Sequence, residues 1–179
     1  FRPNGAPPRL RQRHRRAPSA SVYRILHGDR IMHNLPILGT AQVSHMFSIP
    51  VRRLTAFADL QIVDHHDQRP GTGTTRRYSI ANLMMTKLAW NLQRLGVAPK
   101  KLSFKAELLN IGIKRYLDET KSSSRYMSLY VTSDLAVKVS WHTSTNFPYT
   151  TSILIDLKML HEDVMDALKN ESEYLCQMK

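Results

Sequence analysis

The stretch SIANLMMTKLAWNLQRLG, from Ser79 to Gly96, decides the fold of this chain because its apolar residues recur at the spacing of one helical face. Ser79 can cap the start of a helix, and Gly96 can end one. The apolar face consists of Ile80, Leu83, Met84, Leu88, Leu92 and Leu95. The pattern predicts a helix over residues 79–95 that buries this face in a core.

A second helix is predicted over about residues 103–118, where Ser103 can provide the cap. Its spacing places one apolar set on the inward face. This set consists of Phe104, Leu108, Ile111 and either Tyr116 or Leu117. The second helix is therefore expected to pack against the same core.

Strand patterns follow. Apolar and polar residues alternate over about residues 126–132 and 135–142, which predicts an antiparallel hairpin, and a third strand is expected over 151–157. A closing helix over about 159–178 carries Leu160, Val164, Leu168 and Leu175 on its apolar side. These elements predict an α+β fold in which helices pack on a small antiparallel sheet.

The element order over about residues 103–178 is similar to that of the double-stranded-RNA-binding domain family. In that family the last helix opens with lysines that cross the RNA phosphates. The matching stretch here is HEDVMDALKNESE, from His161 to Glu173, which is acidic and would repel RNA. We therefore transfer no RNA-binding residue from the family and expect this half to pack against proteins.

The chain upstream of Ser79 lacks a clear period. Four prolines in residues 1–20 forbid a regular helix, so we expect a long, basic, extended N-terminal tail. Residues 21–78 give short, mixed apolar signals and are expected to be irregular, with a polar loop at 65–78. The predicted domains are therefore the tail, the irregular basic segment and an α+β body over 79–179.

Positive charge is concentrated in the N-terminal half. The chain has a net charge of +12, and residues 1–105 hold 18 Lys and Arg against 4 Asp and Glu. Such an excess favours a polyanionic partner, and guanidinium groups pair well with phosphate oxygens. The predicted RNA-binding residues are Arg2, Arg9, Arg11, Arg13, Arg15, Arg16, Arg52, Arg53, Arg76, Arg77, Lys100, Lys101 and Lys105.

Motifs for catalysis or metal binding are weak. In DHHDQ, from Asp64 to Gln68, adjacent side chains point in different directions, unlike ligands spaced along one helical face. RPGTGTTRRY, from Arg69 to Tyr78, lacks the Gly-Lys-Ser/Thr of a nucleotide-binding loop. The single cysteine, Cys176, excludes an intrachain disulfide. We predict no catalytic residue, no metal and no cofactor.

These observations predict a structural, non-catalytic subunit of a large ribonucleoprotein, specifically a ribosomal protein of the mitochondrial matrix. Its tail would contact rRNA phosphates, and its C-terminal half would contact neighbouring ribosomal proteins. No apolar run is long enough to span a membrane. Two alternatives stay open: an accessory subunit of an organellar membrane complex, whose tail meets lipid headgroups, and a viral-type coat protein with a basic genome-binding arm.

Overall fold

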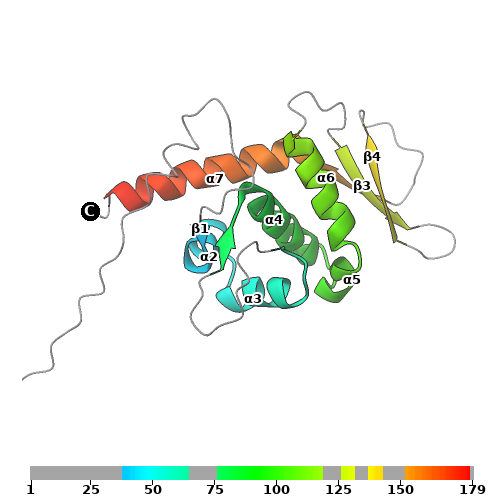
Figure 1. Ribbon diagram of the computed structural model, residues 1–179, viewed down its shortest axis with the longest axis horizontal. Coiled ribbons are helices and arrows are strands. Elements are labelled where there is room, and N and C mark those ends of the chain that lie inside the picture. Colours follow the sequence, from blue (N-terminus) through cyan, green and yellow to red (C-terminus); the bar gives the residue numbers. More distant parts are fainter. Residues whose placement is uncertain (1–37, 65–75, 119–125, 132–136, 143–151, 178–179) are drawn as a thin grey trace, which may run out of the picture.

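The computed structural model describes residues 38–64, 76–118, 126–131, 137–142 and 152–177 (Figure 1). In these ranges the chain forms six helices and two small antiparallel sheets, so the predicted α+β class is confirmed. The helices are α2 (Thr40–Phe47), α3 (Val51–Asp59), α4 (Ile80–Arg94), α5 (Pro99–Ser103), α6 (Ala106–Asp118) and α7 (Leu157–Gln177). The strands are β1 (Leu38–Gly39), β2 (Arg77–Tyr78), β3 (Tyr126–Val131), β4 (Val137–His142) and β5 (Ser152–Asp156). The predicted tail, residues 1–20, lies outside the described residues.

Helix α4 is the centre of the fold and lies where the sequence predicts a helix. Its cap is reciprocal, because the Ser79 hydroxyl oxygen accepts from the backbone N–H of Asn82 and Asn82 Oδ1 accepts from the backbone N–H of Ser79. Leu95, which the pattern assigns to the buried face, is 71% exposed. The reason is that α4 already ends at Arg94. Gly96, which has a φ of +90°, then turns the chain away from the helix axis.

Residues 40–59 form two helices, α2 and α3, where the sequence predicts irregular structure. Each helix is short, and α2 buries only Val43 and Phe47, so few apolar residues repeat and the helical period is weak. Arg77 and Tyr78, at the end of the predicted loop 65–78, form β2 instead. This strand pairs antiparallel with β1.

The helix predicted over about 103–118 corresponds to α6, which begins at Ala106, because Ser103 is the last residue of the short helix α5 and does not start the longer one. Most of its predicted buried face also differs from the observed one. Phe104, Leu108 and Ile111 are 75%, 38% and 48% exposed. Leu117, one of the two predicted alternatives at the end of the helix, is buried as expected. The other residues that face the core are Leu102, Ala106, Leu109 and Ile113. Both sets have helical spacing, and spacing alone does not say which set meets the sheet, so the prediction was wrong for Phe104, Leu108 and Ile111.

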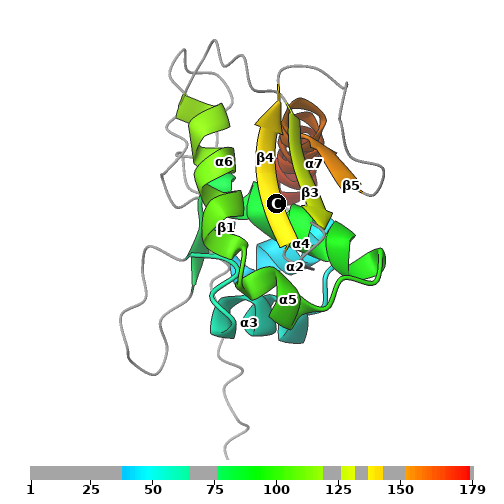
Figure 2. The same ribbon diagram turned by 90° about the vertical axis from the view of Figure 1, so that its right-hand side faces the viewer.

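In the three-stranded sheet, β3 lies in the middle, between β4 and β5. Residue Ser128 of β3 lies opposite Ser140 on one side and Leu154 on the other. Figure 2 shows α6 alongside the sheet. Its close approach depends on Gly112, because the Trp141 indole and the Met127 sulfur occupy the space that a side chain there would need.

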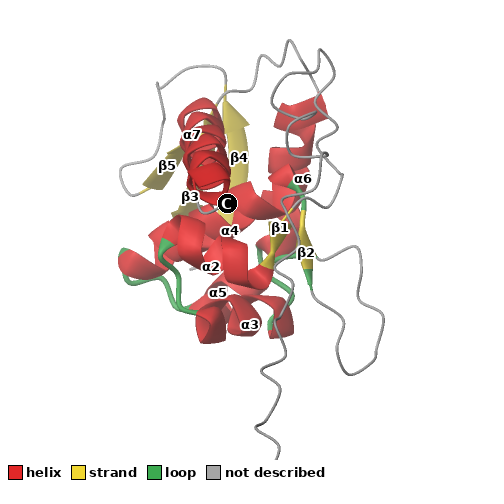
Figure 3. Cartoon of the chain, turned by 90° about the vertical axis from the view of Figure 1, so that its left-hand side faces the viewer, coloured by secondary structure: helices red, strands yellow, loops and turns green. Residues whose placement is uncertain are grey.

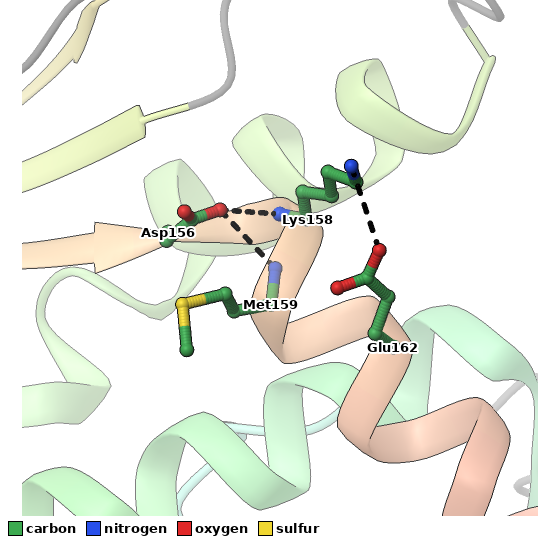
Figure 4. A network of polar contacts seen from close by, with 4 residues as sticks. All are labelled: Asp156, Lys158, Met159 and Glu162. Atoms are coloured by element: carbon green, nitrogen blue, oxygen red, sulfur yellow. Dashed lines mark hydrogen bonds and ion pairs between the residues drawn. The ribbon is translucent and has the colours of Figure 1, made fainter.

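Helix α7 follows β5 directly and begins at a cap. Asp156 Oδ1 accepts hydrogen bonds from the backbone N–H groups of Lys158 and Met159, at 2.9 and 3.1 Å (Figure 4). Lys158 Nζ also lies 3.6 Å from Glu162 Oε1, one turn later. Leu160, Val164 and Leu168 are buried, as their spacing predicts, and α7 packs against α4 and α2. One hydrophobic cluster thus extends from β1 to α7.

Candidate nucleic-acid interface

Helices α2 and α3 are joined by a tight turn of Ser48, Ile49 and Pro50. Ser48 adopts the left-handed conformation, with a φ of 53°, and its backbone N–H donates to the carbonyl of His45 at 3.2 Å. The backbone N–H of Ile49 donates to the Ser44 carbonyl, and the Ser44 hydroxyl donates to the Ile49 carbonyl at 2.7 Å. Because the Ile49 side chain is also buried, the turn fixes the two helices relative to each other. In element order this is a helix-turn-helix, two short helices joined by a turn of three residues.

The second helix of this pair, α3, has one buried face and one exposed face. Leu54, Phe57 and Ala58 are buried, and α3 packs against α2 and α4. Arg52 and Arg53, in the first turn, are exposed. No acidic residue lies in that turn, so the positive end of the helix dipole adds to the two guanidinium charges. The start of α3 is therefore a strongly cationic surface.

Two more of the predicted arginines are Arg76, which directly precedes strand β2, and Arg77, which begins it. Arg76 Nη2 donates to Asp59 Oδ1 at 3.1 Å, which ties β2 to the last residue of α3. Arg77 is exposed, whereas Tyr78 is buried. Burial raises the pKa of the Tyr78 phenol, and a hydrogen bond with Thr40 and the charge of Arg76 oppose that rise. The position of β2 is thus fixed by contacts with both helices of the helix-turn-helix.

The predicted lysines lie on and after α5, at the same end of the molecule as α3 (Figures 1 and 3). Lys100 and Lys101 are exposed, and Lys105 is half-buried. Lys101 and Lys105 line a cleft together with apolar residues, so their surroundings differ from those of the arginines on α3. Among the described residues, the predicted cations therefore fall into two environments, the exposed arginines at the start of α3 and the lysines on and after α5.

Helix α7 lies at the opposite end from α3 and carries the opposite charge (Figure 3). Its described residues include two lysines and five acids. The acids are Glu162, Asp163, Asp166, Glu171 and Glu173. A polyanion that approaches the molecule is thus attracted to the α3 end and repelled from α7.

Sequence reasoning identified Arg52 and Arg53 from their charge alone and missed the helix-turn-helix that presents them. The available signal was Val43 and Phe47, four residues apart, followed by Pro50 and then by Leu54 and Phe57, three residues apart. The six predicted arginines of the tail lie outside the described residues.

Other kinds of site have less support in the described part of the chain. There, no three His, Cys, Asp or Glu side chains come close enough to hold a metal ion, and His65, His66 and Asp67 lie outside it. Within the same ranges, no helix has both the length and the apolar character that a membrane span requires. No family model and no curated protein matches this chain. Function is therefore inferred from the arrangement of α2, α3 and the cations around them.

Proposed function

We propose that this chain is a non-enzymatic nucleic-acid-binding protein that places α3 in the major groove of duplex DNA. The observation that carries the proposal is the helix-turn-helix whose second helix exposes Arg52 and Arg53 in its first turn. In DNA-binding helix-turn-helix proteins, the N-terminal residues of the second helix contact base edges while the first helix crosses the backbone. The exposed start of α3 meets this requirement.

The chemistry of the exposed side chains agrees with this role. An arginine fork can pair with O6 and N7 of guanine, and it can also neutralise phosphates that flank the groove. Arg77 and Lys100 are exposed and are suited to backbone contacts. Arg76 has a different task, because its ion pair with Asp59 holds the end of α3. We therefore assign base contact to α3 and positioning to β2.

The second candidate is the one that composition alone favours: a structural rRNA-binding subunit of a mitochondrial ribosome, with its acidic C-terminal half against neighbouring proteins. Its support is the set of six arginines, without an acid, in the first 20 residues. A tail of this composition can bind the phosphates of DNA as well as those of RNA. We favour DNA because of the exposed start of α3, since the major groove of an RNA duplex is too deep and narrow for side chains to read.

The test is selection of bound molecules by the full chain from a pool of random duplex DNA, followed by affinity measurements on the recovered sequence. A groove-reading helix should enrich one motif, and the enriched duplex should bind at least about tenfold more tightly than a scrambled duplex. The RNA duplex of the same sequence is the control and should bind no better than the scrambled DNA. Enrichment of no motif, together with equal or tighter binding of RNA, would favour the ribosomal candidate instead.

A further inference from the structure

A cleft of about 420 Å³ opens between the end of α4, helix α5 and the corner of the sheet formed by β3 and β5. Its described walls are mainly apolar and include Leu95, Val97, Leu102 and Ile153. Clefts of this size commonly hold small organic ligands. The cleft is distinct from the exposed face of α3, whose residues do not line it.

The turn after α4 shapes one wall of this cleft. The backbone N–H of Val97 donates to the Leu92 carbonyl at 3.0 Å, and Gly96 has a φ of +90°. Apart from Gly96 itself and its two chain neighbours, no described residue has an atom within 4 Å of the position that a Cβ on Gly96 would take, so the space beside the turn is open. Leu95, 71% exposed, stands at this wall. The apolar surface of Leu95 is in contact with water in this position, and an apolar ligand that covered it would bind favourably because it removes that surface from water.

Two cations stand against this apolar surface. Lys101 and Lys105 are the charged residues among the described lining, and neither ammonium pairs with a described carboxylate. By comparison, Lys158 and Lys169 on α7 both have acidic partners. An unpaired ammonium beside an apolar wall is complementary to a ligand that joins an anionic head to an apolar body.

We propose that this cleft binds a small apolar carboxylate, with the carboxylate between Lys101 and Lys105 and the apolar body against Leu95, Val97 and Ile153. Nucleic acid fits this cleft less well, because its phosphates are accompanied by polar sugars rather than by an apolar chain. The proposal does not rest on DNA binding by α3. Aliphatic and aromatic carboxylates share the required chemistry, and the two kinds of probe below distinguish them.

The test is calorimetric titration of the full chain with decanoate and with 1-naphthoate, each compared with its neutral counterpart, decan-1-ol or 1-naphthol. At least one carboxylate should bind about tenfold more tightly than its neutral counterpart, equivalent to about 1.4 kcal/mol. Tighter binding of decanoate would indicate an aliphatic ligand, and tighter binding of naphthoate would indicate an aromatic one. Absence of binding by both carboxylates, or equal binding of the neutral counterparts, would overturn the proposal.

Matched variants locate the binding. K101Q/K105Q should weaken carboxylate binding about tenfold, whereas K114Q, which removes a lysine of α6 outside this cleft, should leave it unchanged. Leu95→Ser should weaken binding by the loss of apolar contact, whereas Met159→Ser, at an exposed apolar residue of α7, should not. Equal losses in the test and control variants would overturn the assignment. The selection experiment with duplex DNA uses none of these carboxylates and none of these variants. The proposals of DNA binding and of carboxylate binding can therefore fail independently of each other.

Discussion

His45 Nδ1 lies 2.7 Å from Glu171 Oε2, and this contact joins the first helix of the helix-turn-helix to α7 across 126 positions of sequence. The Glu171 side chain is 6% exposed and the His45 side chain 56% exposed. Because an ionised carboxylate only accepts hydrogen bonds, the imidazole N–H is the donor. The His45 ring also stacks on Tyr174, with centroids 4.8 Å apart. The acidic helix therefore holds α2 in place.

This difference in exposure predicts unequal effects of removing the two partners. His45→Ala should lower the free energy of unfolding by about 1–3 kcal/mol, because it leaves the buried carboxylate of Glu171 without its donor. Glu171→Ala should cost less, because water can solvate the exposed imidazole that remains. Urea unfolding measures the free energy of unfolding of both variants. The double variant H45A/E171Q should recover part of the stability that H45A loses, because the neutral amide replaces the buried carboxylate. A larger effect of Glu171→Ala than of His45→Ala would contradict this account.

The inward face of α6 gives a second test. Leu109→Ala should destabilise the protein by about 2–5 kcal/mol, because Leu109 is fully buried. Ile111→Ala, on the same helix, should change the free energy of unfolding by no more than about 0.5 kcal/mol. The comparison is made by urea denaturation of the two variants beside the parent. A larger loss of stability in Ile111→Ala than in Leu109→Ala would show that the face with Ile111, which the sequence pattern predicts, is the buried one.

Gly112 should not tolerate a side chain although it lies within a helix. Alanine has a helix propensity about 1 kcal/mol better than glycine, but its Cβ would collide with Trp141 Nε1 and crowd the Met127 sulfur. Gly112→Ala should therefore destabilise by about 1–3 kcal/mol overall. Thermal unfolding provides the measurement. Adding Trp141→Leu should relieve part of the loss, and a Gly112→Ala variant more stable than the parent would show that α6 does not approach β4 this closely.

The cap of α7 is testable by a single substitution. Asp156→Ala removes the acceptor of two backbone hydrogen bonds and should cost about 1 kcal/mol of unfolding free energy. Asp163→Ala is the control, since that exposed aspartate lies within the helix rather than at its start. Chemical denaturation measures the free energy of unfolding of the two variants. Equal losses in Asp156→Ala and Asp163→Ala would mean that the cap does not stabilise α7.

How far the sequence predicts this structure depends on how many apolar residues repeat in each element. Helix α4 repeats its pattern over four turns between Ser79 and Gly96, so its limits are predicted within a residue. Helix α2 has only Val43 and Phe47 to bury, so its period is too weak to recognise. In α6, Leu109 and Ile111 belong to two apolar faces, and the choice between them depends on Gly112 and Trp141, which only the folded chain brings together.

The candidate site was partly predictable for a similar reason. Charge identifies Arg52, Arg53, Arg76 and Arg77 without any knowledge of structure. The ion pair between Arg76 and Asp59, 17 positions apart, forms only when β2 is beside α3. Hence charge alone favours a polyanionic partner, whereas the proposed placement of α3 in a groove depends on the turn between α2 and α3, which the charge pattern does not reveal.

The most direct test of DNA binding through α3 is the dissociation constant of a labelled duplex, measured against salt for R52A/R53A and for the charge-matched control K114A/K138A. The α3 variant should bind at least about tenfold more weakly than the parent, because each lost base contact costs about 1–3 kcal/mol. Its log–log salt slope should fall by about 1–2. The control, which removes two cations from α6 and β4, should bind within about twofold of the parent, well under 1 kcal/mol. Equal losses in the two variants, or unchanged affinity of R52A/R53A, would show that the chain binds by diffuse charge and that α3 does not enter the groove.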